Sequence, residues 1–233
     1  MNEAVATWIA DIALELQAEP DVDATVQAVA EYAKSALECD DVGILMITSG
    51  VIETAAATSD RVREADDLQR ELGEGPCLSS LESHETYIID EILTDPRWPV
   101  WGPKVAALGF RSCLSVQLFT RDRGFGSLNL FSDEPAFFTE DDESVGEIFA
   151  RHASVALAAA RQEDGLLKAI DGRKLIGQAE GILMERFNID ADRAFAVLNR
   201  YSQHHNMKLR AVAERIVTNG QLPGVASGTA AGS

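Results

Sequence analysis

The sequence predicts an α+β domain built on an antiparallel sheet, followed by a small all-α domain of three helices. Two observations in the 233 residues predict this order. Short runs that alternate apolar with polar residues, or are rich in branched apolar ones, are typical of strands and lie between residues 42 and 132. Beyond residue 140 only helical periodicity remains, so the strands end before the C-terminal part of the chain begins.

The first domain begins with two helices and a hairpin. Apolar residues recur at helical spacing over 3–17 and 22–38, and Glu19-Pro20 separates the two runs because proline cannot continue a helix. Val42–Thr48 has the length and branching of a buried strand. Ser49-Gly50 suits a hairpin turn, so a partner strand is expected directly after it.

The rest of the first domain alternates helices with strands. Two glycines and a proline in Gly73–Leu78 predict a turn into a new short helix, and Thr139 can cap a long one. The elements expected are strand 51–58, helix 60–72, strand 86–90, a loop and helix over 95–108, strands 112–120 and 125–132, and a helix from 140 onward. This order implies an antiparallel sheet with its flanking helices to one side.

Three short amphipathic helices are predicted within residues 173–215 and just beyond. An apolar arc from Leu175 to Leu183 defines the first. Asp190 can cap the second, and Gly220 can end the third. Short links join them, as in a compact helical module.

Glycines and composition suggest the domain boundaries. Gly165 and Gly172 interrupt a helical pattern, and each costs about 1 kcal/mol relative to alanine inside a helix. We therefore expect Gly165 to be a weak point between a first domain at 1–162 and a three-helix domain at 163–222. Residues 223–233 are small and uncharged, and are expected to be a disordered tail.

Charge also divides the chain. The net charge is −18, which by itself argues against nucleic acid as a partner. Residues 165–222, however, hold nine Lys and Arg against six Asp and Glu, a net +3, whereas residues 1–164 carry −21. Because the acidic part would repel nucleic acid, any such contact is expected from the helical domain.

Composition excludes several other classes of protein. No apolar run approaches the length of a membrane span, and the N-terminus lacks a basic signal region, so a cytoplasmic location is expected. The three cysteines form no C-x-x-C pair and are expected to be reduced thiols. Paired carboxylates at catalytic spacing, a phosphate-binding loop and a nucleophile elbow are all missing, and we predict no enzyme activity, no cofactor and no metal.

The C-terminal helices carry a specific motif. A-x-G-I-L-M-x-R occurs at Ala179–Arg186, and A-F-x-x-L follows at Ala194–Leu198. Over about residues 165–220 the chain closely resembles the ANTAR family of antitermination domains. The resemblance implies a three-helix module that binds paired RNA stem-loops and thereby prevents transcription termination.

The N-terminal part resembles the GAF family of small-molecule sensor domains. The resemblance spans about residues 20–160 and depends on several short sequence motifs taken together. These motifs are LGEGPC, IIDEI, W-x-x-W, GFRSCLSVQL and GSLNLFS. It implies a GAF fold that responds to an unknown small molecule, so the whole chain resembles a GAF sensor joined to an ANTAR output domain.

The candidate RNA-binding residues are cations and glycines of the helical domain. Gly177 and Gly181 lie four residues apart, opposite the centre of the apolar arc, where either RNA or a partner helix can approach the backbone closely. The cations can contact phosphates, although a solvated charged face is the alternative for each. The full set is Arg173, Lys174, Gly177, Gly181, Lys208, Arg210 and Arg215.

Four further residues near the third helix leave alternatives open. Tyr201 suits either the core beside Leu198 or stacking on an unpaired base. His204 and His205 suit the surface, stacking or, less readily, a metal. Asn206 is expected to cap the third helix.

GAF ligands commonly sit between the sheet and its covering helices, which gives a second set of candidates. The predicted pocket is lined by Cys77, Trp98, Trp101, Phe110 and Cys113. Each of these could equally be plain core. Cys77 and Cys113 also raise an enzyme alternative, because some GAF domains resemble a free methionine sulfoxide reductase that works through low-pKa thiolates.

The sequence therefore predicts a signal-responsive RNA-binding antitermination regulator, with stem-loop RNA and a small molecule as partners. The alternatives are a helix-turn-helix DNA-binding regulator and a cysteine-dependent GAF reductase. A homodimer is expected because apolar side chains of the first helix (Trp8, Ile9, Ile12, Leu16) and an alanine-rich stripe along residues 145–159 exceed what one domain can cover.

Overall fold

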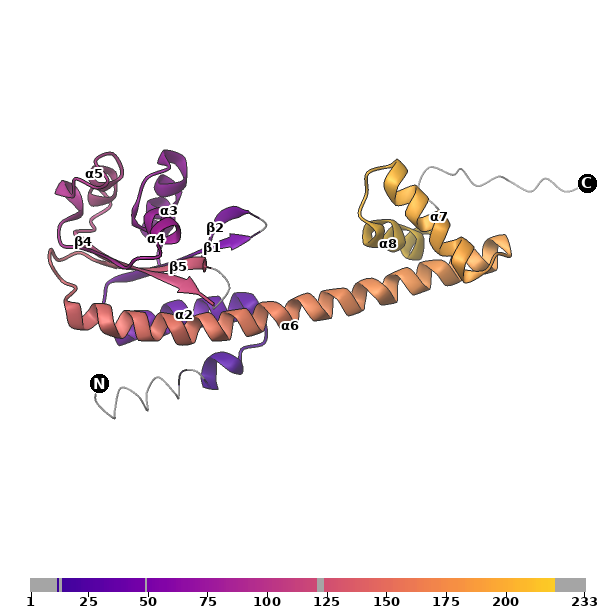
Figure 1. Ribbon diagram of the computed structural model, residues 1–233, viewed down its shortest axis with the longest axis horizontal. Helices are drawn as coiled ribbons and strands as arrows, with labels where there is room; N and C mark the ends of the chain where they lie inside the picture. The colour runs from indigo at the N-terminus through magenta and orange to yellow at the C-terminus, as the bar shows by residue number, and fades with distance from the viewer. Residues whose placement is uncertain (1–11, 13, 49, 121–123, 221–233) are drawn as a thin grey trace, which may run out of the picture. The chain divides into compact units, whose positions relative to one another are not determined.

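The computed structural model describes residues 12, 14–48, 50–120 and 124–220 (Figure 1). The chain divides into two compact units, Met1–Gln162 and Glu163–Ser233, and each is described by itself. Trp8, Ile9 and the predicted tail at 223–233 lie outside the described residues. The α+β fold class predicted from the sequence is confirmed, with a five-stranded antiparallel sheet followed by a helical region.

The sheet of the first unit has the strand order β2-β1-β5-β4-β3, and every neighbouring pair is antiparallel. Its strands are β1 (Asp41–Thr48), β2 (Val51–Ala57), β3 (Tyr87–Ile89), β4 (Ser112–Phe119) and β5 (Gly124–Ser132). All five agree with the strands predicted from the sequence to within two residues at each end. The central strands β1, β5 and β4 are buried over most of their length.

The helices of the first unit also follow the predicted order. They are α2 (Val22–Ala36), α3 (Asp60–Leu72), α4 (Pro76–Ser83), α5 (Trp101–Ala106) and α6 (Glu140–Phe187), with a short 3₁₀ helix at Ile92–Thr94. The predicted cap of α6 is confirmed, since the Thr139 hydroxyl accepts from Asp142 N while the Asp142 carboxylate accepts from Thr139 N. Proline is the first residue of α4, where its missing N–H leaves no helical bond unmade.

Helices cover both faces of the sheet, which corrects the prediction that they lie to one side. α2 and the first part of α6 pack on one face, and α3 and α4 pack on the other (Figure 1). The face against α2 and α6 is apolar, and its core includes Val29, Ile44 and Leu128. The other face is polar at its centre and apolar towards α5, and this difference locates a candidate site.

One helix, α6, continues through both glycines that were expected to interrupt it. The two glycines therefore do not end the helix, and the expectation that Gly165 is a weak point between the domains stays a prediction. A penalty of about 1 kcal/mol per glycine is small beside the helical bonds of the surrounding residues. Gly172 is buried, and a Cβ there would lie 3.9 Å from Cδ of Arg210, which is an ordinary van der Waals contact.

The second unit consists of the C-terminal part of α6 with α7 (Ala191–His204) and α8 (Leu209–Asn219). Their common core is Ala179, Leu183, Ala194, Leu198, Val212, Ala213 and Ile216. The predicted cap at Asp190 is confirmed, since its carboxylate accepts from Arg193 N, and Gly220 ends α8 with φ 65°. The prediction for Asn206 is wrong: Lys208 precedes α8, and Asn206 lies in the turn with φ 49°.

The first predicted helix is described only from Ile12. Ile12 and Leu16 are buried in the core that α2 and α6 share with the sheet. These two side chains were expected to be left for a second subunit, and the chain covers them itself. None of the helices in the described part of the chain combines the length and the hydrophobicity needed to cross a bilayer.

Candidate functional site

A strip along α6 in the second unit carries four of the predicted RNA-binding residues. Arg173, Lys174, Gly177 and Gly181 are all exposed. Their spacing places them on one side of the helix, because residues four and seven apart nearly coincide in direction. A Cβ added at Gly177 or Gly181 would meet nothing within 4 Å, so the backbone here is open to an approaching molecule.

The other three predicted residues belong to α8 and the turn before it. Lys208, Arg210 and Arg215 are exposed as well. Arg210 and Arg215 lie about 140° apart around the helix, so they point to different sides of it. Arg215 donates to the sulfur of Met207 at 3.7 Å, which holds its side chain beside the turn.

The cations of both groups are available to a ligand. Within the described part of the second unit, ion pairs form between Lys168 and Asp164 and between Arg193 and Asp190, and none includes a predicted RNA-binding residue. In the first unit, by contrast, Arg61 and Arg97 are paired with carboxylates at 2.7 and 2.6 Å. Exposed, unpaired cations beside open backbone are suited to phosphate contact.

A second candidate site is a buried polar cluster in the first unit, between the sheet and the helices α3 and α4. Strand pairing brings four polar residues together: Ser115 lies opposite Asn129, and Gln117 lies opposite Ser127. The Ser115 hydroxyl donates to Oδ1 of Asn129 at 2.8 Å. Gly43 lies beside Asn129 on β1 and has no side chain to separate the sheet from α3.

Gly43 allows α3 to approach the centre of the sheet. A Cβ at this position would lie 2.6 Å from Cγ1 of Val62 and 3.3 Å from Oδ2 of Asp66. The close approach places the Asp66 carboxylate over the polar strand residues. Asp66 is fully buried, which is rare for a carboxylate without a partner.

Gln69 and Cys77 form the edge of the cluster at the α3–α4 turn. The amide of Gln69 donates to Sγ of Cys77 at 2.8 Å and accepts from Cys77 N at 2.9 Å. Gly75 passes so close that a Cβ would lie 2.3 Å from Oε1 of Gln69, and its φ of 148° also favours glycine. The turn thus fixes both side chains in place.

Several polar atoms of this buried polar cluster have no hydrogen-bond partner among the residues that the structure describes. They are both carboxylate oxygens of Asp66, the hydroxyl of Ser127, the amide nitrogen of Asn129, and the hydroxyl of Ser80, a buried residue of α4. Leaving a buried polar group unpaired costs about 1–3 kcal/mol, so native proteins seldom do so. The cluster therefore leaves acceptors on α3 and a donor on β5 that a small polar molecule or water would satisfy.

The Asp66 carboxyl also titrates abnormally. Burial raises its pKa to about 7, and the nearby Thr54 hydroxyl, Arg70 and Arg63 lower it only in part. Thr54 makes no hydrogen bond of good geometry to either oxygen, so burial is the dominant cause of the raised pKa. Asp66 can therefore change charge near neutral pH.

The five residues predicted to line a pocket are all buried. Trp98, Trp101, Phe110 and Cys113 belong to an apolar cluster with Phe131, in which the Phe110 and Phe131 rings stack at 4.6 Å. Cys77 belongs instead to the polar cluster. The predicted pocket residues therefore lie on the same side of the sheet as the polar cluster. The sequence analysis did not single out Asp66, Gln69 or the strand serines, and polar alternation in β4 and β5 was the only signal for the serines.

The two cysteines on this side of the sheet are poorly suited to nucleophilic chemistry. Burial raises the pKa of both Cys77 and Cys113 well above the usual value for a thiol, and the negative charge of Asp66 adds to the effect. Both are therefore thiols at neutral pH, whereas the nucleophile in cysteine chemistry is the thiolate.

Comparison with solved structures agrees with the fold of the first unit. The GAF domain of an Acinetobacter phosphoenolpyruvate-protein phosphotransferase is similar with a TM-score of 0.53 and 16% identity, over 70% of this chain and 97% of that one. A free methionine-R-sulfoxide reductase from Neisseria meningitidis, solved in complex with its substrate, has a TM-score of 0.54 and 19% identity, over 70% and 95%. At such identities the likeness shows the fold alone.

Family models cover both units. No curated protein sequence matches the chain. A model of the GAF domain matches residues 19–158, and a model of the ANTAR domain matches residues 164–217. The chain therefore belongs to the GAF family and carries an ANTAR domain directly after its GAF domain.

Proposed function

We propose that this protein is a cytoplasmic, signal-responsive RNA-binding regulator that prevents transcription termination. The observation that carries the proposal is the ANTAR match over residues 164–217. The exposed strip Arg173–Gly181 and the net positive charge of this part of the chain support it, since phosphate contacts need unpaired cations beside accessible backbone.

The test is binding of the full-length protein to stem-loop RNA and to duplex DNA at several salt concentrations. Stem-loop RNA should bind more tightly, with affinity falling as salt rises. Replacing Arg173 and Lys174 together by alanine should weaken binding and lower the salt slope by about 2, one for each phosphate contact. Lys168→Ala is the matched control, because Lys168 is already paired with Asp164 at 2.6 Å.

One result would contradict this function and another would contradict only the assigned residues. Preferential binding to duplex DNA would favour the helix-turn-helix alternative. Equal affinity in the double variant and in Lys168→Ala would remove Arg173 and Lys174 from the interface. Independently of these variants, crosslinking the protein to cellular RNA and sequencing the bound fragments would identify the target.

We infer that the GAF unit senses a small polar molecule at the buried polar cluster. Its unpaired atoms include two acceptors on Asp66 and a donor on Asn129, so a suitable ligand carries both donor and acceptor groups. The structurally similar reductase was solved with its own substrate. A thermal-shift screen of small polar metabolites on the wild type and on Asp66→Asn tests this inference, and a hit should lose most of its shift in the variant.

The protein acts without catalysis in this proposal. A reductase needs an accessible thiolate, and the buried Cys77 and Cys113 thiols oppose one. The discriminating measurement is reduction of free methionine sulfoxide by the full-length protein. Turnover that disappears in Cys77→Ser or Cys113→Ser would support the reductase alternative instead.

We also propose a homodimer, with an interface different from the one expected from the first helix. Ile12 and Leu16 are covered by their own domain, whereas Leu166, Leu167 and Ile170 on α6 are 62, 56 and 51% exposed. Three large apolar side chains within five residues are unusual on a monomer surface. A second copy offers the same apolar surface, so a two-fold pairing would be self-complementary.

A further inference from the structure

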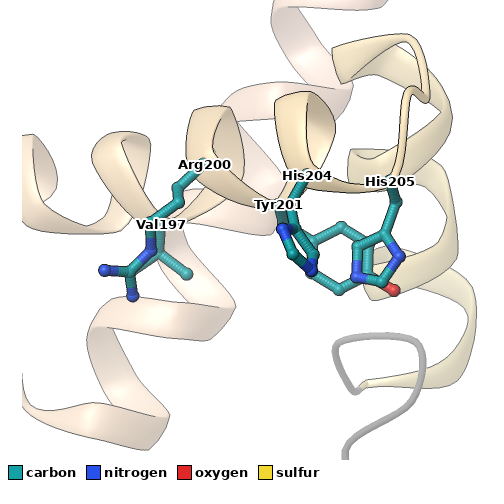
Figure 2. Close-up of a pocket in the computed structure, with 5 residues that line it drawn as sticks. All are labelled: Val197, Arg200, Tyr201, His204 and His205. Carbon is teal, nitrogen blue, oxygen red and sulfur yellow. The ribbon is translucent and has the colours of Figure 1, made fainter.

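An open groove of about 330 Å³ lies on α7 in the second unit, and no predicted RNA-binding residue lines it. Its lining residues are Val197, Arg200, Tyr201, His204 and His205. The first four recur at three- and four-residue spacing, which places them on one face of the helix. Figure 2 shows Val197 and Arg200 at one end of the groove and the three rings at the other.

The three rings form a preorganised aromatic surface. The Tyr201 and His205 rings lie 4.1 Å apart at 31°, so they nearly stack, and the His204 ring stands almost perpendicular to His205 at 5.0 Å and 86° (Figure 2). Tyr201 is half-buried and packs against the core of the unit, which holds its ring in place. His204 and His205 are exposed. A planar molecule can therefore extend the stack with little ordering of side chains.

Arg200 supplies a cation at the other end of the groove. Its side chain is exposed, and it takes part in neither of the ion pairs that the described residues of this unit form. It is four residues before His204, one turn along the same face. A groove with aromatic rings at one end and a guanidinium at the other has the chemistry of a nucleotide site, because a base is planar and its phosphate is anionic.

A metal site is the other use that two neighbouring histidines suggest. A bound metal generally needs at least three protein ligands. Nowhere in the described part of the chain do three His, Cys, Asp or Glu side chains gather as a metal would require. The groove also contains Arg200, whose charge would repel a metal cation.

We propose that this groove binds an unpaired base from the loop of a stem-loop RNA, stacked on the Tyr201, His204 and His205 rings, with Arg200 on the adjoining phosphate. The proposal rests on the proposed RNA-binding function and adds a second subsite to the strip Arg173–Gly181. Bases inside a duplex cannot reach such a groove, whereas loop bases can be splayed out and stacked on aromatic side chains. The groove therefore recognises the loop, and the α6 strip contacts phosphates.

The experiment compares two probes on the full-length protein. One is a pool of RNA hairpins with a fixed stem and randomised loops, and the other is the same stem closed by a non-nucleotide linker. Two variants are compared with the wild type. One is the double variant Arg200→Gln/His204→Ala, and the other is the single variant His205→Ala. All three positions are exposed, so the fold should survive. Arg193→Ala is the matched control, an exposed arginine of the same helix that is paired with Asp190.

Loss of one stacked base should weaken binding by about 5- to 150-fold, the factor that a base–aromatic stack contributes. We expect the Arg200/His204 variant to lose at least about fivefold in affinity on looped hairpins and to bind the linker-closed stem like the wild type. The Arg173/Lys174 variant should weaken on both probes. Arg193→Ala should leave both affinities unchanged.

The outcomes separate this proposal from the proposed function. If the wild type binds neither probe, the RNA-binding function itself fails. If it binds both probes equally, or if the groove variants lose affinity for both to the same degree, RNA binding stands and the base subsite is overturned. Crosslinking of a 4-thiouridine placed in the loop to a peptide of α7, found by mass spectrometry, would be independent support.

Discussion

Asp66 is the residue whose surroundings depart most from its ordinary chemistry. Its carboxylate is fully buried, and none of the described residues donates a hydrogen bond to either oxygen. The nearby strand residues are polar as well, so Asp66 is part of a buried polar cluster and is not an isolated charge in an apolar core. A buried group with a shifted pKa in a polar cluster is typical of a functional site.

The shifted pKa of Asp66 predicts how stability depends on pH. The folded-state pKa of about 7 exceeds that of the unfolded chain, so the folded protein binds more protons between about pH 4 and pH 7 and loses stability as pH rises through that window. A shift of this size corresponds to about 4 kcal/mol above pH 7. Asp66→Asn cannot ionise, so it should be more stable than the wild type at pH 8 and should gain little at pH 4.

Urea denaturation at pH 4, 6 and 8 measures this effect. Glu64→Gln is a matched control on the exposed side of the same helix. The prediction is wrong if Asp66→Asn keeps the pH dependence of the wild type between pH 4 and pH 8.

At the scale of elements, α6 is unusual because it is one helix of 48 residues that includes several glycines. Gly177 and Gly181 have open space where a side chain would be. Nothing inside the folded chain therefore requires glycine at either position. Glycine destabilises a helix relative to alanine, so its presence at both positions is better explained by a ligand that must contact the bare backbone.

Gly181→Ala separates stability from binding. Alanine should stabilise the helix by about 1 kcal/mol, because it restricts the unfolded chain and meets no neighbour in the fold. RNA affinity should fall if the phosphate backbone packs against this strip. Thermal denaturation and hairpin binding measure the two effects, and Gln178→Ala is an exposed control on the same helix. A variant that is more stable and binds RNA as well as the wild type would exclude close approach at Gly181.

At the scale of the whole molecule, each unit has its own core. The core residues of the first unit end at Leu157, and those of the second begin at Ala179. A mutation in one core should therefore act mainly on the unit that contains it.

Paired core mutations test this independence by calorimetry. Leu198→Ala removes a fully buried side chain from the second unit and should destabilise it by about 2–5 kcal/mol. Leu114→Ala does the same in the first unit. Each should lower one thermal transition and leave the other within about 1 °C, since distant sites behave additively. A single transition that both variants lower equally would show that the units unfold together.

The proposed dimer makes a prediction at the same scale. Replacing Leu166 and Ile170 together by glutamine removes two exposed apolar side chains and should shift the protein towards monomer in light scattering at micromolar concentration. Lys168→Gln, on the opposite side of the helix, should leave the mass unchanged. A wild-type protein that is monodisperse and monomeric would contradict the proposed interface.

The sequence by itself determined the strands, most helices and the order of the two domains. These features follow from local periodicity and from capping residues such as Thr139 and Asp190, whose effects extend over one or two turns. Local pattern also placed Arg173, Lys174, Gly177 and Gly181 on the exposed side of a helix. It could not show that the helix continues through Gly165 and Gly172, because a penalty of about 1 kcal/mol per glycine does not decide the extent of a long helix.

Only the tertiary structure decided what surrounds each face of the sheet. The alternation of Ser115 and Gln117 with apolar neighbours is the same whether the polar side meets water or helices, so the sequence could not reveal the buried polar cluster. In the sequence, Asp66 is one of several carboxylates in a charged helix. Only the structure shows that Gly43 allows this helix to pack closely on the sheet and bury Asp66. The groove on α7 likewise depends on how Tyr201 packs on its core. Such contacts join residues distant in sequence, and periodicity along the chain carries no information about which distant surfaces meet.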